Sequence, residues 1–279
     1  MNSSGQQYGE VEKFEQHVLT ERKPKAGFSD WQAMARRLGH RGLTRSLELL
    51  DPGDRSGVNN HTVIAERLKK LGLPVQTYTT PTLEVFLDNP LEHLRVFQTG
   101  EYYFVSIRPG LHIAHAKTEA EVVEFVRNAQ LQHPEICGQK EMYVSKNGEA
   151  IMSGHIIVQS DDSMTNTVYA EFTNSEFNQF HRGFTTPEIS VKRGSSGRFE
   201  WTFRGPLASD EWRTDELFRC HTGVRLSRKQ MAEKIHDALL RIPHDERYFM
   251  PGYYEVLIER TPHGTTKPVY IEAIPGGEA

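Results

Sequence analysis

The chain has 279 residues, of which 37% are apolar and 25% are charged, and its formal net charge at pH 7 is −4. These values are typical of a folded globular protein with an extensive polar surface, and the length favours one large domain or two coupled lobes. The net charge argues against a general nucleic-acid binder, and the lack of an apolar run long enough to span a bilayer argues against a membrane protein.

The sequence before position 60 is mostly polar and predicts a helical N-terminal segment, residues 1–59, with a flexible start. Helical patterns occupy 11–21 and 29–39, and a turn-rich stretch follows them. Asn60 can then cap a further helix, which ends at Gly72.

The middle of the chain alternates short strand patterns with a helix. Residues 102–110 and 112–117 are predicted to form two strands. Thr118 and Glu121 form the capping box of an amphipathic helix that follows them. The Asn-Gly pair at 147–148 predicts a hairpin turn between the strands on either side of it.

The second half of the chain predicts mostly strands and one amphipathic helix, which covers 226–242. A short turn at 261–266 joins the last two strands. This order of elements predicts an α+β fold rather than a doubly wound sheet, and the sequence has no G-x-G-x-x-G or Walker A loop. The strand patterns lie at 154–160, 167–173, 187–193, 253–259 and 267–274.

Cys137 and Cys220 are the two cysteines of the chain. They are too few for a disulfide framework in a chain of this size, and the N-terminus has no secretory apolar segment. We therefore expect reduced thiols and a cytoplasmic location.

Between about residues 60 and 275, the order of these segments resembles the ATP-grasp superfamily. In that superfamily ATP is held between two α+β lobes, and the usual reaction is ligation through an acyl-phosphate. The resemblance implies lobes at 60–135 and 136–279, with ATP and Mg²⁺ as cofactors. The resembling segments are NHTVIAERLKKLGLPVQTY (60–78), YYFVSIRPG (102–110), AKTEAEVVEFV (116–126), GHIIVQSDD (154–162), GYYEVLIE (252–259) and VYIEAIP (269–275).

The resemblance also implies roles for individual residues. Arg108 stands where the family usually has a lysine and would contact phosphate as a catalytic cation; its alternative is a surface charge at the end of a strand. Glu255 and Glu272 would hold Mg²⁺, because each carboxylate lies in an otherwise apolar strand, or each would form a structural salt bridge. The backbone around Val158 and Gln159 would contact adenine.

Two further cations are candidates. Lys146 would either reach a phosphate or stay solvated beside the predicted hairpin turn. Arg204 would bind a substrate anion and is a second catalytic candidate. The chain departs from the family pattern at Ile274, where a metal-binding asparagine is usual, and its glycine-rich phosphate flap is not recognisable.

Two functions follow from these observations. The first is an ATP-dependent ligase of the carboxylate–amine type, or a related phosphoryl-transfer enzyme, acting on a small-molecule substrate. The second is a degenerate, non-catalytic ATP-grasp-like binding module that acts through a protein partner. A third reading is an unrelated α+β fold. The segment before residue 60 is too short for the additional lobe of such ligases, so we expect a protein partner or a second copy to complete the site.

Overall fold

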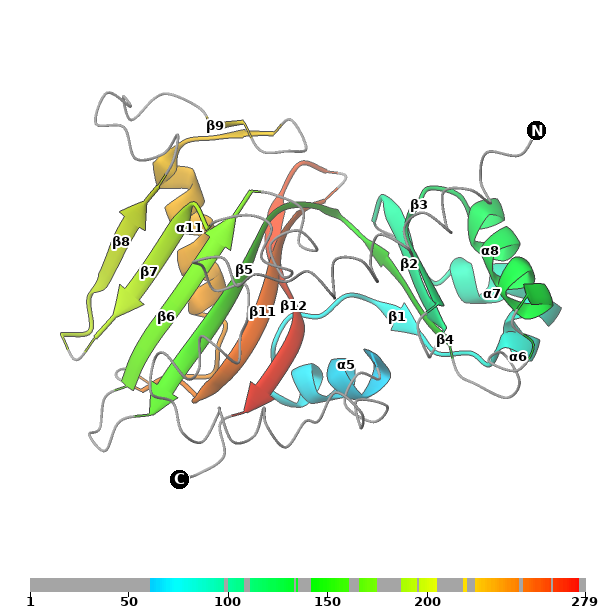
Figure 1. Ribbon diagram of the computed structural model, residues 1–279, viewed down its shortest axis with the longest axis horizontal. Coiled ribbons are helices and arrows are strands. Elements are labelled where there is room, and N and C mark those ends of the chain that lie inside the picture. Colours follow the sequence, from blue (N-terminus) through cyan, green and yellow to red (C-terminus); the bar gives the residue numbers. More distant parts are fainter. Residues whose placement is uncertain are drawn as a thin grey trace, which may run out of the picture.

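The computed structural model contains two α+β units, one built on a four-stranded sheet and the other on a six-stranded sheet (Figure 1). The strand pairings within the described residues are antiparallel. The predicted fold class, α+β with two small lobes and mostly antiparallel sheets, is therefore confirmed. The structure describes residues 61–97, 100–107, 111–132, 134, 142–160, 166–174, 187–194, 196–204, 218–219, 224–245, 248–261 and 263–275, and the predicted segment 1–59 lies outside them.

The four-stranded sheet packs one face against three helices (Figure 1). In spatial order its strands are β1 (Tyr78–Thr79), β4 (Met142–Asn147), β2 (Tyr102–Ile107) and β3 (Leu111–Ala116), and the helices are α6 (Leu83–Asp88), α7 (Pro90–Leu94) and α8 (Glu119–Gln132). Alternate residues of the central strands are apolar and point to the helices. Val105 of β2 and Val144 of β4 thereby join Val122 of α8 in one buried core.

Helix α8 begins at the predicted capping box. The Glu121 N–H donates to the Thr118 hydroxyl at 3.2 Å, and the Glu121 carboxylate accepts from the Lys117 N–H at 2.7 Å. These two bonds satisfy backbone groups that the first turn would otherwise leave without partners.

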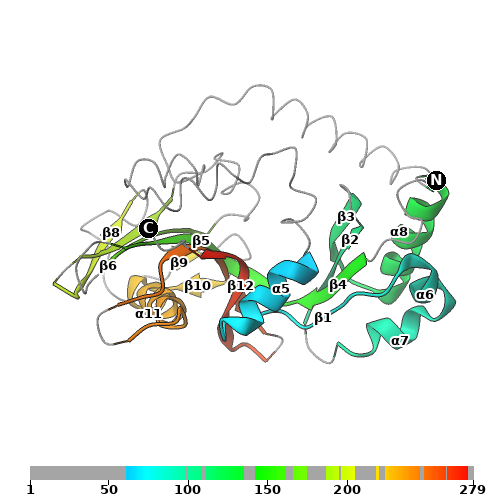
Figure 2. The same cartoon turned by 90° about the horizontal axis from the view of Figure 1, so that it is seen from below.

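The six-stranded sheet packs one face against α11 (Arg228–Leu239), which lies on one side of the sheet in Figure 2. Its strands, in spatial order, are β12 (Thr266–Pro275), β11 (Gly252–Arg260), β5 (Glu149–Ser160), β6 (Asn166–Thr173), β7 (Ile189–Arg193) and β8 (Phe199–Phe203). Ser227 and Gln230 form a capping box at the start of α11, whose buried face includes Met231 and Ile235. A separate pair, β9 (Phe218–Arg219) and β10 (Arg225–Leu226), precedes this helix.

Helix α5 (His61–Lys70) links the two units, and Figure 2 shows it between β12 and β1. Its apolar residues Ile64 and Leu68 belong to the core of the six-stranded unit. On its other side, Lys69 donates to the hydroxyl of Tyr78 on β1 at 3.0 Å. Helix α5 lies within the predicted first lobe, residues 60–135, and its apolar face is buried with the six-stranded sheet.

The predicted hairpin at 147–148 is wrong. β4 pairs with β1 and β2, and β5 pairs with β11 and β6, so the chain passes at Gly148 from one sheet directly into the other. The glycine is required by close packing rather than by a turn, because a Cβ there would lie 2.6 Å from the carbonyl oxygen of Arg260. The two sheets therefore meet at this residue, whereas the predicted lobe boundary lay at 135/136.

In the described parts of the chain, we find no helix with the length and apolar character needed to cross a membrane.

Candidate functional site

Polar side chains form a row across the face of the six-stranded sheet opposite α11. Neighbouring positions along the strands point to the other face, where Tyr254 and Val256 are buried in the core that includes α11. The row gathers carboxylates and a histidine on one side of the sheet. From β12 to β7 it runs through Glu272, Glu255, His155, Glu171 and Ser190.

Glu255 and Glu272 are direct partners across the β11–β12 ladder, and a bulge follows Glu255. Direct partners in an antiparallel pair carry their side chains on the same face, so the two carboxylates face one another. Glu255 is 8% exposed. Burial, followed by the charge of Glu255, raises the pKa of Glu272 to about 8, against the opposing influence of Arg67. The pair therefore favours a bound cation or a retained proton.

Arg67 of α5 lies beside the carboxylate pair and is not among the residues predicted from the sequence. Its Nη1 donates to the carbonyl oxygen of Ala273 at 2.9 Å and lies 3.8 Å from Oε1 of Glu272. The guanidinium is thus a resident cation beside one of the two carboxylates. The helical pattern of α5 gives no signal for this contact, because residues 67 and 272 are joined only by tertiary packing.

Glu255 is also supported from its other side. The Tyr253 hydroxyl donates to Oε1 of Glu255 at 2.6 Å, and Nδ1 of His155 contacts the same hydroxyl. The rings of His155 and Tyr253 stack with centroids 5.8 Å apart. His155 and Tyr253 are each 1% exposed, so this group of three side chains is shielded from water.

Arg204, a predicted catalytic residue, lies at the far end of the row. Its Nη1 is 3.7 Å from Oε1 of Glu171, and the Ser190 hydroxyl donates to the same oxygen at 3.4 Å. Burial raises the pKa of the neighbouring Glu188, while the Asn174 N–H donates to its carboxylate at 2.9 Å and opposes that effect. An ion pair thus engages Arg204, and its role toward a substrate stays a prediction.

The four-stranded sheet carries aromatic side chains on the face opposite its helices. Tyr143 of β4 stacks on Tyr78 of β1 with centroids 5.2 Å apart and an interplanar angle of 20°, and the Phe104 ring meets Tyr143 edge-on at 6.2 Å. Burial raises the pKa of Tyr143 far above its usual range. Flat, largely apolar surfaces of this kind suit the stacking of a planar ring.

The other predicted nucleotide contacts lie elsewhere. Val158 is buried in the core beside α11, and its backbone is in register with Gly252 on one side and Val168 on the other. The ladder therefore occupies the backbone that was expected to bind adenine. Nζ of Lys146 lies 4.8 Å from the centroid of the Tyr103 ring, toward the helix-covered face.

Gln159 pairs with Thr167 near the end of β5. Arg108, the predicted phosphate contact, lies outside the described residues. The structure thus brings together Glu255 and Glu272 from the predicted set, and it places Lys146 and Arg204 apart from them.

The donor set at the carboxylate pair fits a hard divalent cation. Mg²⁺ binds through one or two protein carboxylates and takes its other ligands from phosphate and water. Within the described ranges, no group of three or more His, Cys, Asp or Glu side chains is arranged to hold a metal by protein ligands alone. Glu255 and Glu272 therefore suit a metal that is shared with a phosphate ligand.

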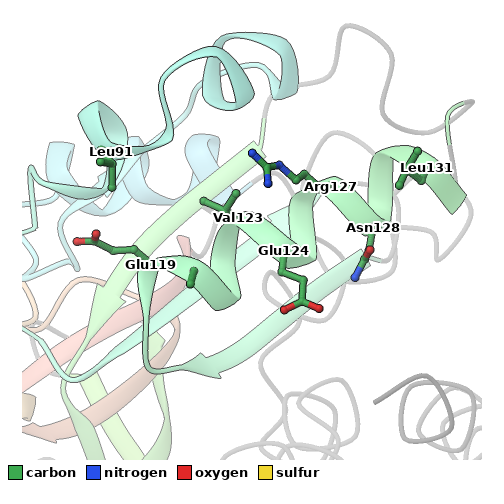
Figure 3. A pocket seen from close by; sticks show the side chains of 8 residues that line it. Leu91, Glu119, Val123, Glu124, Arg127, Asn128 and Leu131 are labelled. Carbon is green, nitrogen blue, oxygen red and sulfur yellow. The ribbon is translucent and has the colours of Figure 1, made fainter. Parts of the chain in front are cut away.

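A shallow hollow lies along the exposed side of α8, away from the carboxylate pair (Figure 3). None of the predicted site residues lines it, and its charged side chains are of both signs. Its lining residues are Leu91, Glu119, Ala120, Val123, Glu124, Arg127, Asn128 and Leu131.

The described architecture has the features that the ATP-grasp resemblance implied. Two α+β units with antiparallel sheets are joined directly, and the terminal pair of strands carries two facing carboxylates. The α+β fold class that the resemblance implied is thus present in the described residues. No protein-family model matches the sequence, and no curated protein matches it.

Among solved structures, the chain is similar to the ADP complex of PurK, an N5-carboxyaminoimidazole ribonucleotide synthetase, with 16% identity and a TM-score of 0.37 over 77% of this chain and 44% of that one. It is similar to the D-alanine–D-alanine ligase from Coxiella burnetii, with 13% identity and a TM-score of 0.34 over 75% of this chain and 45% of that one. It is also similar to the N5-carboxyaminoimidazole synthetase from Staphylococcus aureus, with 11% identity and a TM-score of 0.34 over 76% of this chain and 42% of that one. The chain spans less than half the length of these proteins. These values describe a distant likeness, so the function proposed below rests on the chain's own residues.

Proposed function

We propose that the chain is an ATP-dependent enzyme, a ligase of the carboxylate–amine type or a related phosphoryl-transfer enzyme, with Mg²⁺ held by Glu255 and Glu272. The observation that carries the proposal is the direct pairing of the buried Glu255 with the half-buried Glu272 on one face of the sheet. A like-charged pair in that position is unfavourable unless a proton or a cation lies between the two groups. A cation that also binds phosphate would neutralise the repulsion between the two carboxylates and would bind the nucleotide at the same time.

The residues around the pair have separate tasks in this proposal. Glu255 and Glu272 would bind the metal, which would supply neutralisation of phosphate charge during transfer. Arg67 would orient Glu272 and add a second cation beside the phosphates. Because transfer of this kind depends mainly on positioning and charge, it needs no protein nucleophile.

The four-stranded sheet offers a more suitable binding surface for the adenine base than the backbone at Val158 and Gln159. The Tyr78–Tyr143 stack offers a planar apolar surface, and β4 leads from Tyr143 directly into the junction with the other sheet. We propose that the base lies along this aromatic face and that the phosphates extend toward Glu255.

One observation favours the second function, a non-catalytic binding module. Arg67 already lies 3.8 Å from Glu272, so a resident guanidinium compensates part of the charge that a metal would otherwise neutralise. Together with Ile274 in place of a metal-binding asparagine, this contact suits a protein that binds a nucleotide, or a partner, without turnover. A small-molecule substrate, completion of the site by a second copy or another protein, and a cytoplasmic location belong to the proposal in either form.

Ligand-dependent unfolding tests the proposal. Mg-ATP at about 100 times its dissociation constant should raise the free energy of unfolding by about 2.7 kcal/mol. Glu255→Gln and Glu272→Gln should each lose the Mg²⁺-dependent part of this gain. Glu149→Gln, which removes an ion pair with Arg260 on the same sheet, should keep it. ADP formation that is lost in both site variants identifies the enzyme, and binding without turnover identifies the module. A wild-type chain that millimolar Mg-ATP does not stabilise would exclude both.

A further inference from the structure

Tyr253 lies two residues before Glu255 on β11, so both side chains are on the same face of the sheet. The Tyr253 hydroxyl donates to Oε1 of Glu255 at 2.6 Å, and Nδ1 of His155 contacts the hydroxyl from the neighbouring strand β5. His155 is the register partner of Glu255. The three side chains thus form one connected group beside the proposed metal ligand.

The proton count fixes the direction of these bonds. A phenol has one proton, and Tyr253 gives that proton to Oε1 of Glu255. The contact with His155 therefore requires a proton on Nδ1, which donates to the phenolic oxygen. The chain of donors runs from Nδ1–H of His155 through the Tyr253 hydroxyl to the Glu255 carboxylate.

We infer that Tyr253 and His155 are positioning residues that fix the carboxylate of Glu255 for metal binding. The inference rests on the proposed function and extends it to the shell behind the ligand. A donor aimed at one oxygen of an ionised carboxylate forms a strong, directional bond, so it fixes how the carboxylate is turned. The stack of the His155 ring on Tyr253 restrains the tyrosine itself. Outer partners of metal ligands commonly change metal affinity by about 10–100-fold when they are removed.

The adjacent tyrosine provides a matched control. Tyr254 is also fully buried, but it points to the opposite face, and its hydroxyl donates to the carbonyl oxygen of Met250 at 2.8 Å. Tyr253→Phe and Tyr254→Phe each remove one buried hydroxyl, the first together with its bonds to Glu255 and His155 and the second together with its bond to Met250. Both variants should lose stability, whereas only Tyr253→Phe alters the surroundings of Glu255.

The test measures Mn²⁺ binding to the full chain by electron paramagnetic resonance, with and without a non-hydrolysable ATP analogue. The Mg²⁺ dependence of the analogue's affinity is measured by calorimetry. Tyr253→Phe should raise the metal dissociation constant about tenfold or more and change the Mn²⁺ spectrum. Metal-free affinity for the analogue should stay unchanged, and Tyr254→Phe should match the wild type in both measurements.

A second pair of variants keeps the test open if Tyr253→Phe fails to fold. His155→Asn places an amide N–H where Nδ1 lies and should retain most of the metal affinity, whereas His155→Leu should lose it. Equal metal affinity in Tyr253→Phe and Tyr254→Phe, or in the two His155 variants, overturns the positioning role while wild-type metal binding stands. A wild-type chain without metal-dependent nucleotide binding overturns the proposed function and this inference together.

Discussion

Replacing Glu272 by glutamine should change how the stability of the protein depends on pH. Burial and the charge of Glu255 raise the pKa of Glu272 from 4.5 to about 8 in the folded chain. A carboxyl group that binds its proton more tightly when folded stabilises the folded state at low pH. That contribution is fully present below pH 4.5 and is lost as the pH rises toward about 8. Stability of the wild type should therefore fall across this window.

The size of the effect follows from linkage. One group that keeps its proton on folding changes the free energy of unfolding by up to about 1.4 kcal/mol per pH unit. Between pH 5.5 and pH 7.5 the wild type should therefore lose about 2–3 kcal/mol relative to Glu272→Gln. Because glutamine carries no charge, the variant should be the more stable protein at pH 8, although it gives up the contact with Arg67.

Urea unfolding at pH 5.5, 6.5, 7.5 and 8, without metal or nucleotide, measures the difference. Glu149→Gln is the control, because it removes an ion pair with Arg260 from the same sheet and has no carboxylate facing it. This control should lose about 1 kcal/mol and keep the wild-type slope. Parallel pH profiles for the wild type and Glu272→Gln would refute the reasoning, as would lower stability of the variant at pH 8.

Two further substitutions test the local packing. Gly148→Ala should lower the free energy of unfolding by about 1–3 kcal/mol, because its Cβ would lie 2.6 Å from the Arg260 carbonyl oxygen. Gly194→Ala is the control and should cost far less, because a Cβ at position 194 has no atom within 4 Å. Equal urea midpoints for Gly148→Ala and Gly194→Ala would show that the backbone at the junction shifts to accommodate the added Cβ. Ser227→Ala should cost about 1 kcal/mol by removing the N-cap of α11, and a melting temperature equal to that of the wild type would contradict the capping assignment.

Local pattern was sufficient to predict the end of the chain. The strands β11 and β12 are joined by a short turn, and a short turn between two strands leaves little choice of partner. The alternation of apolar residues then indicates which carboxylates stand out within each strand. These two facts bring Glu255 and Glu272 near one another, whereas their direct pairing depends on the bulge between Glu255 and Val256, which shifts the register by one residue. Their role toward a metal stays a prediction.

The remaining site depends on contacts between segments that are distant in sequence. Arg67, which lies on a helix, contacts Glu272, which lies 205 positions later in the chain. The hydrophobic periodicity of the helix does not predict such a contact. His155 is a polar residue in an apolar strand, but its position beside Glu255 follows only from the pairing of β5 with β11. Short elements such as β1 and α7 fall below the length at which a pattern can be recognised. At 147–148 the local turn signal was overridden by the close approach of the Arg260 backbone.

The junction between the sheets explains how a ligand could be held by both units. Glu259 lies on β11, four residues beyond Glu255, and its carboxylate accepts from the side chain of Gln76 at 2.7 Å and from the Gly148 N–H at 3.2 Å. Gln76 precedes β1, so one buried carboxylate ties the strand that carries Glu255 to the segment that carries Tyr78. Burial raises the pKa of Glu259, and the two donated bonds oppose that rise. Because this link joins the buried Glu259 to a backbone N–H and to the half-buried Gln76, the separation of the aromatic face from the carboxylate pair is set by the fold before any ligand binds.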